Sequence, residues 1–246
     1  MRQTLSKLAS EKPRRFSQQS LDFLLKAGRQ KKVDWLEKNK AEYNEVLRLP
    51  FIELAEYIKQ ELKPQARGYH FPTKGLGRLK RANFKVAAGL PLYKNWISMI
   101  ASRPSQSRFE SNPHLFFGIF PDENQILVAG GHYTPTSQQT RLIREAISKD
   151  SDPFHDLFND PQFKSRFKGG FHMEMVANRV PRGFPEDHRD VNWIKLKNFI
   201  VMKKIPKKLF ASAKLRESIV EDYKQALRLN RLLDYALRAE WPPPED

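Results

Sequence analysis

HLFFGIFPDENQILVAGGHY, residues 114–133, is the stretch from which the fold can be predicted. Its two apolar runs, 114–120 and 125–133, contain aromatic and β-branched residues and are separated by polar turn residues. Such runs are typical of β-strands, and a connection of four or five residues favours an antiparallel hairpin. We therefore expect an antiparallel sheet at the centre of the molecule.

Outward from this hairpin, the sequence alternates between strand and helix patterns. Further strands are predicted over 95–101, 171–177 and 197–205. Apolar residues at three- and four-residue spacing predict helices. Helices are expected over residues 20–26, 34–47, 50–62, 137–148 and 212–239, and short helical pieces over 151–168. Ser20 is expected to cap the first of these helices. The predicted fold class is α+β, with a mostly antiparallel sheet covered by N-terminal and C-terminal helices.

The predicted domain organisation is simple. Residues 1–16 are polar and basic and are expected to form a flexible arm, 17–241 a single domain, and 242–246 a tail. Three of the four tryptophans, Trp35, Trp193 and Trp241, are interpreted as packing residues. A length of 246 residues suffices for a sizeable core.

Composition narrows the classes of function. The chain has no cysteine, which excludes disulfides, thiol catalysis and thiolate-bound metals. No apolar run reaches the length of a membrane span or signal peptide, so we expect a soluble, cytoplasmic protein without a membrane partner. The net charge of +16 favours polyanionic partners.

The positive charge is concentrated in one window. Residues 62–109 contain ten Lys or Arg and no Asp or Glu, and aromatic residues are interleaved with them: Tyr69, Phe71, Phe84, Tyr93 and Trp96. Guanidinium groups beside aromatic faces suit phosphate or carboxylate ligands. The alternative interpretation is a solvated basic loop beside a core strand.

Two glycine pairs are candidate anion sites. Gly75 and Gly77 follow Lys74, but neither a dinucleotide-binding fingerprint nor a Gly-Lys-Ser/Thr sequence is present. Gly130 and Gly131 end an apolar strand, where glycines either let the backbone approach a ligand or accommodate a bulge. No pattern indicates a cofactor.

The six histidines show no metal-binding spacing, so no metal site is predicted. An acidic cluster, Glu186, Asp187 and Asp190, surrounds His188 on a loop rich in proline and glycine. Acid–base chemistry there would require convergence with another group across the fold.

The order of several motifs resembles a family of conserved hypothetical proteins found mainly in bacteria, domain of unknown function 2461. The resemblance begins with WLEKNKAEY, residues 35–43, and covers the chain from about residue 20 to its C-terminus. Further matching positions are Arg78, Arg81, Phe84, Pro91, Tyr93, Lys94, Gly130, Gly131, Tyr133, Pro135, Arg144, Pro181 to Phe184 and Leu196 to Phe199. The family's Arg-Asp-x-Arg-Phe is RANF here, and Leu92 interrupts its Pro-Tyr pair. The resemblance implies a mixed α+β fold and no established reaction.

Three hypotheses of function follow. In the first, a basic pocket binds a phosphorylated or carboxylated small molecule, with the candidate residues Arg78, Arg81, Tyr93, Lys94, Gly130, Gly131, Tyr133 and Arg144. In the second, the same basic face binds nucleic acid. In the third, an enzyme of unknown reaction uses the His188 loop beside Arg78 on an anionic substrate.

Overall fold

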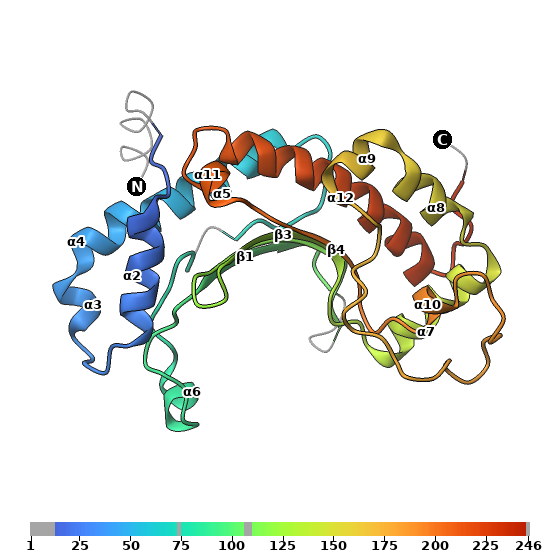
Figure 1. Ribbon diagram of the computed structural model, residues 1–246, viewed down its shortest axis with the longest axis horizontal. Helices are drawn as coiled ribbons and strands as arrows, with labels where there is room; N and C mark the ends of the chain where they lie inside the picture. The colour runs from blue at the N-terminus through green and yellow to red at the C-terminus, as the bar shows by residue number, and fades with distance from the viewer. Residues whose placement is uncertain (1–12, 73–74, 106–109, 245–246) are drawn as a thin grey trace.

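The predicted α+β fold is confirmed by the computed structural model, which describes residues 13–72, 75–105 and 110–244 (Figure 1). Its sheet is antiparallel with the strand order β1-β2-β3-β4. The strands are β1 (Ile97–Ser102), β2 (His114–Phe120), β3 (Gln125–His132) and β4 (Phe199–Lys204). Each strand therefore pairs with its neighbour in sequence, and α7 to α10 form the long excursion between β3 and β4.

The predicted hairpin forms with the expected connection. β2 and β3 pair from His114 with Gly131 to Phe120 with Gln125. Asn124 adopts a positive φ of 51° in the turn, a conformation that Asn tolerates better than most residues. The turn residues and the two apolar runs therefore favour the same register between β2 and β3.

The helices before the sheet are α2 (Gln18–Gly28), α3 (Trp35–Lys38), α4 (Lys40–Tyr43), the π-helix η2 (Asn44–Arg48), α5 (Leu49–Glu61) and the short α6 (Asn83–Ala87). The prediction of Ser20 as a helix cap is wrong, because Ser17 precedes the first turn. The Ser20 hydroxyl accepts a hydrogen bond from the Ser17 N–H and donates one to the Val46 carbonyl at 2.6 Å. Ser20 therefore joins α2 to η2.

The helix predicted over 34–47 is divided. The Asn39 side chain donates to the Trp35 carbonyl at 2.8 Å, so it competes with the helical hydrogen bonds and separates α3 from α4. Pro50 lies in the first turn of α5, as predicted. Since Pro50 has no N–H for the carbonyl four residues earlier, the hydroxyl of Ser20 supplies the bond to Val46 instead.

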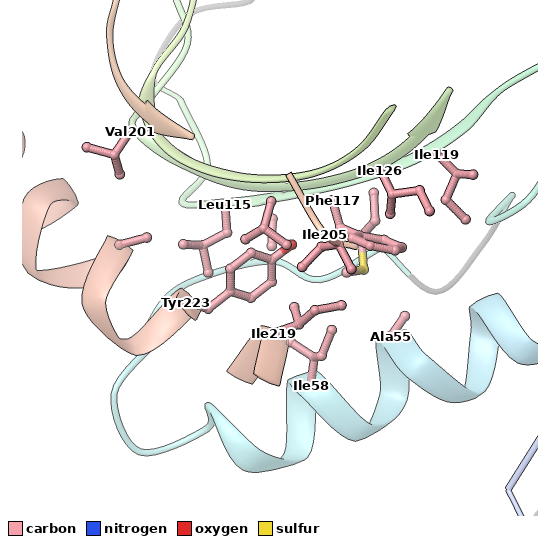
Figure 2. Packing of buried hydrophobic residues seen from close by; sticks show 14 of the residues in the cluster. Ala55, Ile58, Leu115, Phe117, Ile119, Ile126, Val201, Ile205, Ile219 and Tyr223 are labelled. Carbon is pink, nitrogen blue, oxygen red and sulfur yellow. The ribbon is translucent and has the colours of Figure 1, made fainter. Parts of the chain in front are cut away.

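The helices after β3 are α7 (Ser137–Lys149), α8 (Asp152–Asn159), α9 (Pro161–Arg166), α10 (Val191–Ile194), α11 (Lys207–Phe210) and α12 (Leu215–Leu237). The long helix α12 lies across the same side of the sheet as α5 (Figure 1). Figure 2 shows the core between them, with Leu115, Phe117 and Ile119 pointing from the sheet toward Ile58 and Ile219. The hydrophobic core is therefore built on one face of the sheet.

The strand predicted over 171–177 does not form. Its alternation of apolar residues is genuine, but beyond the buried Phe171 its apolar side is not covered, since Met173 and Met175 are 43% and 42% exposed. A single bridge, Val176 with Leu196, joins it to the chain before β4. The segment is an extended loop.

The ends of the chain pack on the domain where they are described. Residues 1–12 of the predicted arm lie outside the described residues, but Phe16 is buried and Arg14 pairs with Glu53. At the other end, Trp241 is buried and donates to the Asp150 carbonyl, as expected of a packing residue. Among the described residues, no helix has the length and apolar character needed to cross a membrane.

Candidate functional site

One face of the sheet faces away from α5 and α12, and we call it the open face. Side chains alternate between the two faces along each strand, so this alternation and the register between strands determine which residues lie on the open face. They are Ser98, Ile100, Ser102, His114, Phe116, Gly118, Phe120, Gln125, Leu127, Ala129, Gly131, Ile200, Met202 and Lys204. None of these residues is acidic. Leu127, Ala129 and Ile200 are buried here but do not belong to the main core.

Three partly exposed aromatic side chains form a row along the open face, which we call the aromatic row: Trp96, Phe120 and Phe116. The ring centroids of Trp96 and Phe120 are 5.9 Å apart, and those of Phe120 and Phe116 are 6.2 Å apart. The planes of these pairs differ by 27° and 17°. The row therefore begins just before β1 and continues along β2.

Gly118 explains how the two phenylalanine rings lie. A Cβ at this position would be 2.5 Å from the Phe120 ring and 2.6 Å from the Phe116 ring. Both rings must therefore lean over the glycine backbone instead of standing away from the sheet. A larger residue would displace them outward.

The basic stretch identified in the sequence forms an arm beside this row. Residues 78–94, the basic arm, are held at their base by antiparallel bonds from the Arg81 N–H to the Leu92 carbonyl and from the Lys94 N–H to the Leu79 carbonyl. The short helix α6 (Asn83–Ala87) lies at the tip of the arm and projects from the body of the molecule (Figure 1). The arm and the aromatic row meet where the Lys94 ammonium lies 4.6 Å from the Trp96 ring centroid.

Four cations of the basic arm form a cluster: Arg78, Arg81, Lys85 and Lys94. Burial, followed by the positive charges of Arg81, Lys85 and Arg78, lowers the pKa of Lys94. In the part of the chain that the structure describes, Arg78, Arg81 and Lys94 form no ion pair with a carboxylate, and the buried Nε of Arg81 has no hydrogen-bond partner. The cation cluster is thus a local excess of positive charge.

Tyr93, predicted to contact a ligand, is a core residue. It is 0% exposed, its hydroxyl donates to the Val33 carbonyl at 2.7 Å, and its ring packs edge-on against Trp35. Its place in the fold is to anchor the base of the basic arm to the helical layer.

Gly75 and Gly77 belong to a turn before the arm. Both have positive φ, and the Gly77 carbonyl accepts a hydrogen bond from the Tyr43 hydroxyl at 2.7 Å. This turn fixes where the arm begins.

Gly130 and Gly131 have packing roles at the far end of β3. A Cβ on Gly130 would lie 2.4 Å from the Ala226 Cβ on α12, and one on Gly131 would lie 2.1 Å from the Phe199 carbonyl oxygen. Gly131 also adopts a φ of +118°, which disfavours any side chain. Close approach of α12 and β4 therefore accounts for both glycines.

The last two candidates also lie away from the arm. Tyr133 follows β3 and is 51% exposed. Arg144 donates from Nη2 to the Leu196 carbonyl at 2.8 Å, and burial lowers its pKa.

Gly131 pairs with His114, whereas the arm leads into the end of the sheet where Ile97 pairs with Ile119. The register thus separates the predicted residues into two groups at opposite ends of the sheet.

The enzyme hypothesis required the His188 loop to lie beside Arg78, and this is wrong. Figure 1 shows the loop beside α10 and α7, at the end of the long axis opposite the basic arm. His188 instead accepts a hydrogen bond at Nδ1 from the Asp190 N–H. Glu186 and Asp187 are exposed.

Asp190 is the centre of a network that the sequence did not indicate. Its carboxylate accepts a hydrogen bond from the Ser151 hydroxyl and pairs with His155 Nε2 at 2.9 Å and with Arg189. Burial opposes ionisation of Asp190, but the bonds from Ser151 and His155 and the charges of His155 and Arg189 outweigh it and lower its pKa. Ser151 donates to the carboxylate and not to His155, so the group joins the loop to α8 and is not arranged for nucleophilic attack.

Two surface hollows of the molecule lie away from the predicted site residues. They have volumes of about 100 and 60 Å³ and are lined by residues near Phe16 and near Gln125, and both are smaller than typical ligand pockets. Neither includes a predicted site residue. Within the described ranges, no three His, Asp or Glu side chains gather in a way that could hold a metal ion.

Comparison with known proteins supports the resemblance seen in the sequence. A family model for conserved hypothetical proteins, DUF2461, matches residues 19–232. The chain belongs to this family. Searches of curated proteins and of solved structures returned no match.

In this member of DUF2461, the family motifs fall at both ends of the sheet. The motif residues Arg78, Arg81 and Lys94 lie on the basic arm, while Gly130 and Arg144 lie with α7 and α12 at the other end. The aromatic row lies outside those motifs, and sequence reasoning missed it as a site. Its signal was Trp96 beside an apolar segment, together with Phe116 and Phe120, which are four residues apart and so lie on the same face of β2.

Proposed function

We propose that this protein binds phosphate-bearing ligands through the cation cluster. The observation that carries the proposal is that the positive charges of Arg78 and Arg81 act on Lys94, while none of the three has a carboxylate partner in the described part of the chain. Like charges held together in this way repel one another, and an anion between them would relieve that repulsion.

Phosphate fits these groups better than an uncharged ligand. Guanidinium groups donate paired hydrogen bonds to phosphate oxygens, and the ammonium of Lys94 adds a point charge. The cations lie on an arm and not in one of the two hollows, so the proposed ligand lies along a surface. A cytoplasmic location, where such polyanions are abundant, is part of this proposal.

The test measures binding of inorganic polyphosphate by fluorescence competition at 50 and 200 mM salt. We expect affinity to fall steeply with salt, and the double variant Arg78→Gln/Lys94→Gln to bind at least about tenfold more weakly. The matched control, Lys164→Gln/Lys168→Gln, removes two exposed charges from α9 and the residues just after it and should bind like the parent protein.

Thermal unfolding of each variant confirms that its fold is intact. Polyphosphate that does not bind, or binding that falls equally in the two double variants, would show that bulk charge alone acts and would overturn the proposal. Loss confined to the Arg78→Gln/Lys94→Gln variant supports it.

A further inference from the structure

The aromatic row continues directly from the cation cluster, because Lys94 belongs to the cluster and lies 4.6 Å above the Trp96 ring. We propose that the ligand is a single-stranded nucleic acid, whose bases stack on Trp96, Phe120 and Phe116 while its phosphates contact the cation cluster. This inference rests on the proposed function and names its class of ligand.

The orientation of the rings is the first argument. Phe116 and Phe120 both lean over Gly118, with their planes 17° apart, and both are partly exposed. A ring that lies along a sheet offers its face to solvent, and the face is the part that stacks on a base. The glycine between the two rings is what allows this arrangement.

The position of the rings is the second argument. The β2 side chains that serve the core, Leu115, Phe117 and Ile119, point toward α5 and α12 (Figure 2). Phe116 and Phe120 lie on the other face and are not part of the core cluster. Core packing therefore does not account for them.

The size of the row fits a short segment of chain. The ring centroids of Phe116 and Phe120 are 6.2 Å apart, and Trp96 extends the row by a further 5.9 Å. Antiparallel sheets that bind RNA stack two or three bases on aromatic side chains of this kind. The aromatic row thus matches two or three consecutive bases.

The charge around the aromatic row favours nucleic acid over other ligands that could bind an apolar face. The open face has no acidic residue, and the cation cluster lies at its end. A small phosphate would leave the rings unused, and a duplex would hide the faces of its bases. A single strand presents both phosphates and open base faces.

The experiment compares 12-residue oligo-U and oligo-dT, a 12-base-pair duplex and inorganic polyphosphate on the full chain. The variant Phe116→Leu/Phe120→Leu keeps both side chains apolar but removes the stacking faces. We expect it to bind both single strands about tenfold more weakly and to bind polyphosphate with unchanged affinity. Tyr57→Leu, a partly buried aromatic on α5, is the control and should bind every probe like the parent.

A second variant keeps both phenylalanine residues and changes only the position of their rings. Gly118→Ala puts a methyl group where the rings lie, so it should displace them and weaken single-strand binding several-fold without loss of polyphosphate. Single-strand affinity that is unchanged in both variants would overturn the inference, even if the cation variants weaken it and so support the proposed function. Equal affinity for the duplex, or an aromatic effect on polyphosphate as large as on oligo-U, would also overturn it.

Discussion

At the scale of single residues, His132 is expected to control the response to acid. It is 0% exposed at the end of β3, and neither ring nitrogen has a hydrogen-bond partner within the described residues, although Ser111 and Gln139 lie nearby. Burial, and then the charge of His114, lowers its pKa from 6.5 to about 4. Between those two pH values the unfolded chain binds a proton that the folded chain does not.

The folded state should therefore lose stability as the pH falls from 6.5 to about 4 and lose no more from this group below that. The total is about 3 kcal/mol, from roughly 1.4 kcal/mol per pKa unit. Urea unfolding at several pH values would measure it for the parent and for His132→Gln. The variant should show a shallower slope, and an unchanged slope would contradict the assignment.

The identity of site residues was only partly predictable from sequence. Tyr93 and Arg81 lie in the same basic stretch, yet the ring of Tyr93 is inside the core and Arg81 joins the cation cluster. Residue type and order carry no information on which side chain turns inward. The position of Arg78 relative to Lys94 depended on the antiparallel pairing of the arm, which the sequence did not indicate.

At the scale of elements, the contact between α12 and β3 depends on Gly130. Its missing side chain lets Ala226 approach, since a Cβ would lie 2.4 Å from the Ala226 Cβ. Gly130→Ala should destabilise the protein by about 1–3 kcal/mol, because backbone must shift to relieve the overlap. Denaturant unfolding measures this loss.

Ala226→Gly in the same chain tests the cause. Alone it should cost about 1 kcal/mol as a glycine within a helix. Combined with Gly130→Ala it should remove the clash, so that the double variant is more stable than the sum of the two losses predicts. Strict additivity would show that the two positions do not oppose each other.

Elements were predictable where local signals agreed with tertiary packing. The hairpin 114–133 formed because turn residues and apolar runs indicated the same register. The strand over 171–177 failed because alternation predicts a strand only when a surface covers its apolar side, and Met173 and Met175 have none. Asn39 divided a periodic helix through one side-chain hydrogen bond, which periodicity cannot show.

At the scale of the whole molecule, the sequence predicted a sheet covered by helices but not which face they leave open. That choice follows from long-range packing: α5 and α12 meet over Leu115, Phe117 and Ile119 (Figure 2). Because the helices cover one face of the sheet, the basic arm and the aromatic row lie together at the edge of the open face. The same packing separates Gly130 and Arg144 from the basic arm.

The last prediction concerns Phe16, just before the expected N-terminal boundary of the folded domain. The expected boundary was residue 17, yet Phe16 is 3% exposed and stacks on Phe210 at 4.9 Å, with Phe51 and Phe117 beside it. It joins the N-terminal helices, the sheet and α11, so its removal would leave a cavity where three parts meet. Phe16→Ala should cost about 3–5 kcal/mol in the free energy of unfolding. Arg15→Ala, an exposed neighbour, should change stability by less than about 0.5 kcal/mol. Equal unfolding midpoints for these two variants would place the boundary at residue 17, whereas the expected difference means that a chain beginning there lacks part of its core.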